Sequence, residues 1–405
     1  MKLSKQLPLI LIFISLIALA TGYFYGLRLN DITGIFSSSK SGTSNIQDST
    51  NQHITSDTLA NVPTKKSKNK KHEATSSKQE TEVDEFEPLP IDSFISIDLH
   101  ARNCPISEEA SIELLANYLQ RKAITDLEKA RSIYIWLTKN VSYDDIGFNS
   151  GIYGDLSAEG VLKSRKAVCE GFSNLFLALG KQMKLEIQKV SGYAKGYGYR
   201  VGETYSKPNH AWNIIKINGQ WKIFDATWGE GNGVNVNGKL VSTKKFNNFW
   251  FNVNPFIAIF SHFPENRSKQ NIKPELDLNS YSKFPRIEES YFDLGFDPTT
   301  TYNSLYRNRN LTFPTSYSSG TYVKANSAPM FGILHLKKLY SFEFYAPRAI
   351  SIAVINSKNE WTYFDRKKGV FSLSYTPEIA GKLEISIKYD KGGDNYHTFM
   401  EYTVK

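Results

Sequence analysis

The stretch HAWNIIKINGQWKIFDATWG, residues 210–229, decides the fold because its pattern predicts an antiparallel hairpin. Asn218-Gly219 in its middle is the pair that a two-residue hairpin turn prefers, since both turn positions need a positive φ. Apolar and β-branched residues run on both sides of this pair, which is typical of paired strands. The sequence therefore predicts strands over 210–217 and 220–226, with the side chains of each strand alternating between two faces.

The turn also sets the register of the two strands, which places Trp212 opposite Asp225. The next pair on the same face is His210 with Thr227. His210 and Asp225 are then diagonal neighbours, with Cβ atoms within about 7–8 Å of each other. We therefore expect a hydrogen bond from the imidazole to the carboxylate, which would fix the tautomer of the histidine and stabilise its charged form.

Cys169 is the candidate nucleophile for this pair. Apolar residues follow it at helical spacing: Phe172, Leu175, Phe176 and Leu179. At the start of such a helix, the dipole and the free backbone N–H groups stabilise a thiolate and supply part of an oxyanion hole. If this helix packs against the hairpin, Cys169, His210 and Asp225 form a triad of nucleophile, base and orienting carboxylate.

Other interpretations of these residues stay open. Cys169 forms a disulfide with Cys104 in one of them, and is an inert buried thiol in another. Trp212 and Trp228 either stack on a substrate or belong to the core. His262 lies in a Phe-rich segment and is assigned a structural role. The histidines show no spacing typical of zinc ligands, so the sequence predicts no metal site and no cofactor.

Helices precede the hairpin in the sequence. Ser107 is expected to cap a helix that runs to about Arg121, and residues 125–128 form a capping box for the next helix. After the cysteine helix, the apolar period changes to that of a strand over 185–191. Helices followed by an antiparallel sheet indicate an α+β core.

The tail predicts a separate all-β domain, in keeping with an aromatic content of 13%, which favours strands. Its short β-type runs are Phe331–Leu336, Tyr340–Phe344, Ile350–Ile355, Trp361–Phe364, Val370–Tyr375, Leu383–Tyr389 and Thr398–Val404. Short strands at this density are typical of an immunoglobulin-like sandwich. A passage rich in Pro and Asn around 274–298 separates the tail from the core.

The N-terminus indicates a membrane segment. Two lysines within residues 2–5 precede an apolar run of about 21 residues, which is long enough to span a bilayer. An uncleaved signal anchor, forming a transmembrane helix, is our first interpretation, and a signal peptide cleaved after Ala20 is the alternative. The body is exported in both cases, tethered to the membrane at the cell envelope in the first and secreted in the second. The polar composition of residues 29–90 predicts a disordered tether.

The net charge of +9 does not indicate a nucleic-acid partner. Basic residues are spread along the chain, apart from one block at residues 65–71. That block is either solvated linker or a contact to an anionic surface such as lipid head groups or a cell-wall polymer. No nucleic-acid-binding module accompanies it.

Three motif blocks resemble those of the transglutaminase-like superfamily of papain-like thiol enzymes: AVCEGFS at 167–173, NHAWN at 209–213 and WKIFDATWG at 221–229. SGYAKG at 191–196 is similar to the stretch between the first two blocks. IDLHA at 97–101, FWF at 249–251 and HFPE at 262–265 resemble the kyphoscoliosis peptidase branch in particular. Together these segments cover about 180 residues, less than half of the chain.

The resemblance implies a papain-like fold in which Cys169 is the nucleophile, His210 the general base and acid, and Asp225 the orienting residue. The chain lacks the carboxylate-rich loop of the calcium-dependent animal enzymes, so no calcium requirement is expected. The implied reaction is acyl transfer on peptide amides through a Cys169 thioester, with peptide-bond hydrolysis as the first choice. The alternatives are a protein-glutamine amine transferase that cross-links proteins, and a non-catalytic cell-surface scaffold with a vestigial triad.

The sequence thus predicts a signal anchor at 1–28, a tether at 29–90, a catalytic core at 91–275 and a β-sandwich at 285–405. The expected partners are a protein or peptide substrate and a membrane that holds the N-terminal segment. A cell-envelope protein or glycan is a further expected partner, bound by the C-terminal domain.

Overall fold

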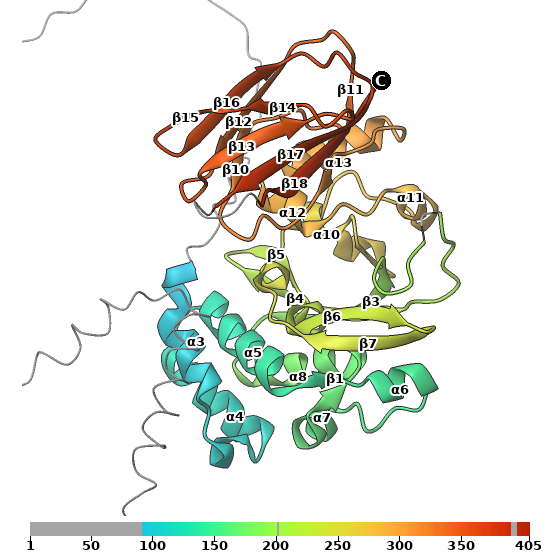
Figure 1. Ribbon diagram of the computed structural model, residues 1–405. Coiled ribbons are helices and arrows are strands. Elements are labelled where there is room, and N and C mark those ends of the chain that lie inside the picture. The colour runs from blue at the N-terminus through green and yellow to red at the C-terminus, as the bar shows by residue number, and fades with distance from the viewer. Residues whose placement is uncertain (1–90, 201, 390–394) are drawn as a thin grey trace, which may run out of the picture. The chain divides into compact units, whose positions relative to one another are not determined.

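The computed structural model describes residues 91–200, 202–389 and 395–405 (Figure 1). In these ranges no helix combines the length and the apolar character that a bilayer crossing requires. This finding contradicts the predicted signal anchor and transmembrane helix, and with them the predicted membrane tethering and extracytoplasmic location. Residues 1–28 and the predicted tether at 29–90 themselves lie outside the described part.

Helices form the first part of the core: η1 (Ile91–Phe94), α3 (Ile95–Arg102), η2 (Ile106–Glu109), α4 (Ile112–Leu119), η3 (Gln120–Lys122), α5 (Asp126–Asn140), α6 (Asp145–Ser150), α7 (Ala158–Ser164) and α8 (Cys169–Gln182). The predicted capping box is confirmed, because Thr125 and Glu128 exchange side-chain and backbone hydrogen bonds at the start of α5. The predicted cap at Ser107 is wrong. Ser107 lies inside the 3-10 turn η2, and the Ser111 hydroxyl caps α4 by accepting from the backbone N–H of Leu114 at 3.2 Å.

A four-stranded antiparallel sheet in the order β5-β4-β3-β8 follows the helices. Its strands are β3 (Ile187–Ala194), β4 (His210–Ile217), β5 (Gln220–Phe224) and β8 (His262–Pro264). The hairpin register is confirmed, since Ile217 pairs with Gln220 across Asn218 and Gly219, which have φ of 49° and 81°. β5 is shorter than predicted: it ends at Phe224, because the next residue caps a helix.

Both faces of this sheet are covered. Helix α8 packs on one face, where Phe176 meets Phe224 in an edge-to-face contact with ring centroids 6.1 Å apart. On the other face, Trp212 packs into a small cluster with Trp250 and Val253. Figure 1 shows α5 and α8 on the same side of β4. Burial on both faces explains why nearly every residue of β4 is buried.

Short elements complete the core around this sheet. They are the parallel pair β1 (Ser142–Tyr143) and β2 (Lys166–Ala167), α9 (Ala226–Glu230), the hairpin β6 (Gly231–Val236) and β7 (Lys239–Lys244), η4 (Asn248–Trp250), α10 (Pro255–Ala258), η5 (Arg267–Gln270), α11 (Leu278–Lys283), α12 (Glu289–Asp293) and α13 (Pro298–Arg307). The sequence did not predict the β6–β7 hairpin or the helices α12 and α13.

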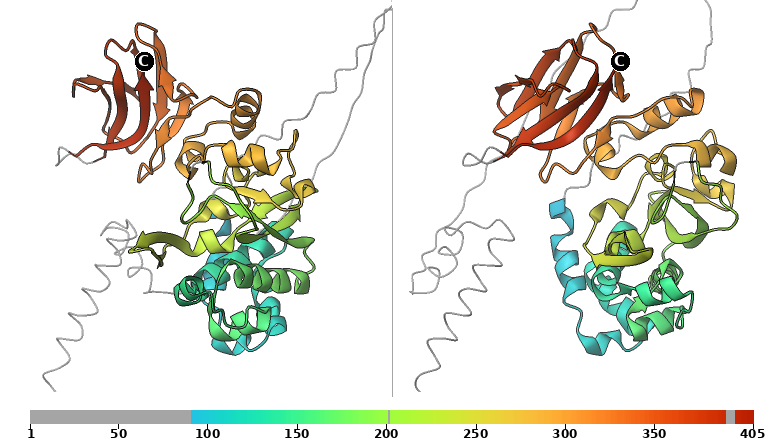
Figure 2. Two further views of the ribbon diagram at one scale, coloured as in Figure 1. Left: turned by 90° about the vertical axis from the view of Figure 1, so that its right-hand side faces the viewer. Right: turned by 45° about the vertical axis from the view of Figure 1, so that its right-hand side comes forward.

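The C-terminal region is all-β, as predicted, and consists of two sheets (Figure 2). Its strands are β9 (Thr315–Ser316), β10 (Lys324–Ser327), β11 (Ile333–Leu334), β12 (Tyr340–Tyr345), β13 (Ser351–Ile355), β14 (Trp361–Tyr363), β15 (Asp365–Lys367), β16 (Val370–Tyr375), β17 (Gly381–Lys388) and β18 (His397–Val404). All seven predicted segments contain strands, and β9, β10 and β15 are additional. All pairings in this region are antiparallel except that of β11 with β18.

Aromatic side chains fill the space between the two sheets, whose faces pack against each other. Phe342 of β12 contacts Tyr402 of β18, and Phe344 contacts Phe399, with ring centroids 5.9 and 5.2 Å apart. The mixed α+β core followed by a sheet-on-sheet region agrees with the predicted fold class.

The domain boundary between 275 and 285 stays a prediction. One hydrophobic cluster runs across it, from Ile259 and Phe260 to the strands of the C-terminal sheets. Within that cluster Phe260 packs on Phe292 with ring centroids 5.7 Å apart.

Candidate active site

Asp225 lies at the centre of the candidate site and is the N-cap of α9. Its Oδ1 atom accepts hydrogen bonds from the backbone N–H groups of Thr227 and Trp228, at 2.9 and 3.0 Å. Aspartate is a favoured residue at this position because its carboxylate satisfies backbone donors that the helix leaves free. The side chain is 1% exposed, and its second oxygen, Oδ2, points away from the helix toward β4.

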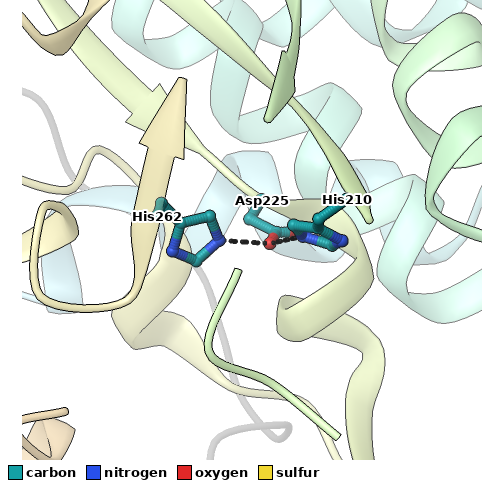
Figure 3. A group of neighbouring side chains, drawn as sticks. All are labelled: His210, Asp225 and His262. Atoms are coloured by element: carbon teal, nitrogen blue, oxygen red, sulfur yellow. Dashed lines mark hydrogen bonds and ion pairs between the residues drawn. The ribbon is translucent and has the colours of Figure 1, made fainter. Parts of the chain in front are cut away.

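His210 is the first residue of β4, and its Nε2 atom lies 2.6 Å from Asp225 Oδ2 (Figure 3). The predicted contact therefore exists, but Asp225 reaches it from a helix cap rather than from a paired strand. The predicted pairs of Trp212 with Asp225 and of His210 with Thr227 do not form, because the chain leaves the sheet after Phe224.

The two groups shift each other's pKa strongly. Burial disfavours the charged imidazolium of His210, but the carboxylate of Asp225 outweighs it and raises the pKa of His210 well above its usual range. Burial also disfavours the carboxylate, yet its hydrogen bonds and charge interactions with His210 and His262 hold the pKa of Asp225 below its usual range. His210 is therefore held as an imidazolium beside an ionised Asp225.

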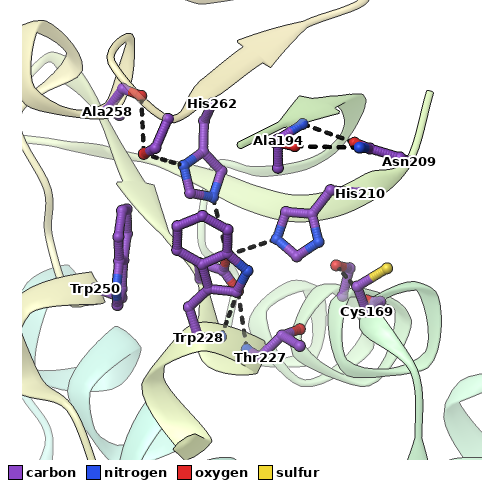
Figure 4. Close-up of polar contacts among 12 residues, drawn as sticks. Cys169, Ala194, Asn209, His210, Thr227, Trp228, Trp250, Ala258 and His262 are labelled. Carbon is purple, nitrogen blue, oxygen red and sulfur yellow. Dashed lines mark hydrogen bonds and ion pairs between the residues drawn. The ribbon is translucent and has the colours of Figure 1, made fainter. Parts of the chain in front are cut away.

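Cys169 is the first residue of α8, as predicted, and it faces His210 (Figure 4). A hydrogen bond and the charge of Cys169 both contribute to the raised pKa of His210. Asn213 of β4 ties α8 to the sheet by donating to the carbonyl of Ser173 at 3.1 Å. Because Asp225 engages Nε2, Nδ1 is the ring nitrogen of His210 that is left for the thiol.

Both cysteines are free thiols, so the alternative of a Cys104–Cys169 disulfide is not realised. Gly171, two residues after Cys169, lies in close contact with neighbouring elements. A Cβ atom there would lie 2.7 Å from the Cβ of Ala167 and 2.8 Å from a methyl group of Val161. The absence of a side chain at Gly171 thus lets β2 and α7 pack against the first turn of α8.

Cys169 and His210 open onto one cleft. It is lined by Tyr143, Phe148, Cys169, Tyr197, Asn209, His210, Thr227, Trp228, Glu230, Gly231, Asn232, Gly233, Leu240 and Ser242. Trp228 is thus placed where a substrate would lie, and its binding role stays a prediction. Trp212 is only 3% exposed and does not line the cleft, which opposes its predicted contact with a substrate.

His262 is a residue of this site to which sequence reasoning gave only a structural role. Its Nε2 atom lies 3.0 Å from Asp225 Oδ2, and its Nδ1 atom lies 2.8 Å from the Ser261 hydroxyl. The pairing of β8 with β3, in which His262 is opposite Ala194, brings it there. No local spacing signals this contact, because it depends on a pairing between distant segments.

His210, Asp225 and His262 are the one group in the described ranges whose side chains could jointly reach a metal ion. Ligand atoms about 2.0–2.1 Å from a tetrahedral zinc would lie about 3.3 Å from one another. The observed separations of 2.6 and 3.0 Å between nitrogen and oxygen are instead hydrogen-bond distances. The geometry therefore favours a hydrogen-bonded network over a metal centre.

Comparison with known proteins agrees with this geometry. The model of the transglutaminase-like superfamily matches residues 113–226. Human kyphoscoliosis peptidase is 26% identical over 318 residues, which cover 78% of this chain and 44% of that protein. The Lim and transglutaminase domain protein ltd-1 of Caenorhabditis elegans is 27% identical over 233 residues, which cover 54% of this chain and 32% of that protein. The matches thus span less than half the length of these relatives.

A solved structure from Cytophaga hutchinsonii, described as a candidate cysteine protease, is 26% identical in sequence. The likeness covers 38% of this chain and 46% of that chain, with a TM-score of 0.23. A score this low adds nothing to the assignment, which depends on the sequence matches. Residues 113–226, which contain Cys169, His210 and Asp225, match the transglutaminase-like superfamily, and the similarity to the kyphoscoliosis peptidases supports the branch that includes them.

Proposed function

We propose that this protein is a thiol enzyme that performs acyl transfer on peptide amides through a thioester at Cys169. The observation that carries the proposal is that Cys169 and His210 meet at one cleft, with the buried Asp225 hydrogen-bonded to His210. A cysteine beside an imidazolium that a buried carboxylate holds in place is the arrangement that activates a thiol for nucleophilic attack.

In the first half of the reaction, the Cys169 thiolate attacks the carbonyl carbon of the amide. The C–N bond then breaks, and the imidazolium of His210 gives its Nδ1 proton to the departing amine. In the second half, a water molecule attacks the thioester and His210 takes a proton from it. The C–S bond breaks, a carboxylic acid is released, and the Cys169 thiolate is restored beside the imidazolium of His210.

Hydrolysis of a peptide bond is the first choice for the overall reaction, supported by the name of the human relative, kyphoscoliosis peptidase. Transfer from a glutamine carboxamide to an amine uses the same first half, with an amine in place of water in the second. The acceptor therefore decides between protease and transferase. A non-catalytic scaffold is the outcome if Cys169 proves inert.

Alkylation by iodoacetamide at near-neutral pH tests the thiol, and Cys104 is a control within the same chain. Burial and the neighbouring Glu109 raise the pKa of Cys104 to about 12, so this thiol should react slowly. Cys169 should react much faster, and the His210→Ala substitution should remove the difference. Labelling of Cys169 no faster than that of a free peptide thiol would contradict an enzymatic role.

A peptide library, incubated with and without an amine acceptor, separates the two reactions. New peptide termini indicate hydrolysis, whereas incorporation of the amine without cleavage indicates transfer. Cys169→Ser is the matched control, because it keeps the shape of the site and replaces only the nucleophilic sulfur. Neither product should appear with this variant.

A further inference from the structure

We propose that His262 is a positioning residue, which holds the carboxylate of Asp225 in the orientation that His210 requires. Its consequence for catalysis depends on the proposed thiol chemistry, whereas its effect on the geometry of Asp225 does not. His262 lies 37 residues after Asp225 in the sequence, outside both the cysteine helix and the hairpin. Its role therefore goes beyond the three residues of the proposed triad.

Every hydrogen-bond site of the Asp225 carboxylate is occupied. An ionised carboxylate offers about four lone-pair sites for hydrogen bonds. Two backbone N–H groups of α9 occupy Oδ1, and His210 and His262 occupy Oδ2 (Figure 3). Without His262, one site of a carboxylate that is 1% exposed would lack a donor, and water could not readily replace it.

The neighbours of His262 also select its tautomer. To donate from Nε2 while neutral, the ring must accept a hydrogen bond at Nδ1, and the Ser261 hydroxyl lies 2.8 Å from that atom. The other acceptor for this hydroxyl, the carbonyl of Ala258, is more distant at 3.4 Å (Figure 4). Ser261 is therefore placed to hold His262 in the tautomer that donates to Asp225.

The charge state of His262 agrees with this role. Burial lowers its pKa to about 4, against the opposing effect of Asp225, so the ring is neutral at pH 7. The charged groups that face it are Asp225 on α9, His210 on β4 and Arg286 between α11 and α12. Because His262 is neutral, it adds a hydrogen bond to the carboxylate without competing with the positive charge of His210.

The surroundings of His262 keep its ring in place. Trp228 and Trp250 pack against it with ring centroids 4.4 and 4.8 Å away, and Trp212 meets it edge to face at 5.0 Å. The strand that carries His262, β8, is held in place by its pairing with β3. Asp225 is thereby linked to three separate elements, α9, β4 and β8, so its carboxylate cannot rotate away from His210.

Two substitutions test the role of the donor. His262→Gln places an amide N–H near the position of Nε2, whereas His262→Leu removes the donor and keeps an apolar side chain. We expect His262→Leu to lower kcat for the proposed reaction on the order of tenfold or more, with KM nearly unchanged, because misorientation of the histidine affects the chemical step. His262→Gln should recover most of the loss. His335→Gln, at an exposed histidine, is the control and should change neither constant.

A spectroscopic measurement makes the test independent of turnover. The proton between His210 and Asp225 should give a downfield imidazole N–H resonance in the unaltered protein and in His262→Gln, and this resonance should shift or vanish in His262→Leu. If the unaltered protein shows the resonance but no activity, the proposed function fails and the positioning role stands. If His262→Leu keeps both the resonance and kcat, the positioning role is overturned.

Ser261→Ala serves as the second variant if His262→Leu does not fold. Loss of the hydroxyl removes the hydrogen bond that holds the tautomer, so the nitrogen chemical shifts of His262 should report a mixture of tautomers. The alkylation rate of Cys169 should also fall below that of the unaltered protein. Unchanged nitrogen shifts together with an unchanged alkylation rate would overturn the role.

Discussion

At the scale of single residues, Asp225 combines a structural and a chemical task by using its two oxygens separately. Oδ1 caps α9, as an aspartate does at the start of many helices, and Oδ2 faces two imidazoles. The two hydrogen bonds of the cap hold the carboxylate in one direction, independently of its contacts with the histidines. A local folding rule thus orients the group that the proposed reaction needs.

The buried imidazole of His262 should leave a signature in the pH dependence of stability. Its pKa in the folded protein, about 4, lies below its ordinary value of about 6.5. Its contribution to stability is therefore fully present above about pH 6.5 and is lost as the pH falls through 4, by up to about 1.4 kcal/mol per pH unit. We expect the free energy of unfolding to fall less between pH 7 and pH 4.5 in His262→Gln than in the unaltered protein.

Urea titrations at a series of pH values measure this difference. The raised pKa of His210 acts in the opposite sense, because its contribution is present below about pH 6.5 and is lost at higher pH. The titration of His210 therefore does not affect the free energy of unfolding between pH 4.5 and pH 6.5, where His262 acts. Equal slopes for the two proteins would show that His262 titrates normally.

At the scale of elements, the position of α9 depends on its contact with α5. A Cβ atom at Gly229 would lie 1.9 Å from the hydroxyl oxygen of Tyr134, which is fully buried and donates to the carbonyl of Asn247 at 2.7 Å. Only glycine allows this close approach. The same short helix begins at Asp225, so its packing on α5 sets the place of the carboxylate.

Gly229→Ala is therefore expected to disturb both stability and the site. Overpacking of this kind costs about 1–3 kcal/mol of unfolding free energy, and the displaced α9 should slow alkylation of Cys169. Gly154→Ala is the matched control, because a Cβ atom there meets nothing within 4 Å and the backbone needs no positive φ. Chemical denaturation and the alkylation rate measure the two effects, and equal values for both variants would contradict the proposed packing constraint.

At the scale of the whole described chain, buried contacts tie the segment after residue 275 both to the core sheet and to the C-terminal region. The side chain of Lys195, the residue directly after β3, is fully buried and donates to the carbonyl oxygens of Tyr281 and Phe284, at 2.9 and 2.6 Å. Burial lowers the pKa of this lysine to about 7. Farther along, Tyr291 donates to the carbonyl of Met330 at 3.3 Å.

A chain ended at residue 275 tests the predicted domain boundary. It would lack the carbonyl acceptors of Lys195 and the aromatic cover of Phe260, so we expect a much lower melting temperature or aggregation. Thermal unfolding of this shortened chain beside the full chain measures the effect. A cooperative transition at an unchanged temperature would instead establish residues 91–275 as an independent domain.

Local patterns in the sequence sufficed to predict a large part of the architecture. The capping box before α5, the start of α8 at Cys169, the Asn218-Gly219 turn and the C-terminal strands all follow from interactions within a few residues. The proximity of His210 and Asp225 was also expected, because a hairpin turn determines which positions of its two strands are neighbours.

By itself, the sequence determined the helices and strands with strong local signals, together with the position of Cys169 at the start of α8 and the proximity of His210 to Asp225. Only the tertiary structure decided that Asp225 leaves the sheet to cap α9, that Trp212 is buried, and that His262 shares the carboxylate. The physical reason is the sequence distance between the groups that interact. Caps and turns depend on neighbours in the chain, whereas the pairing of β8 with β3 joins segments that are distant in sequence and leaves no mark on the local pattern of either one.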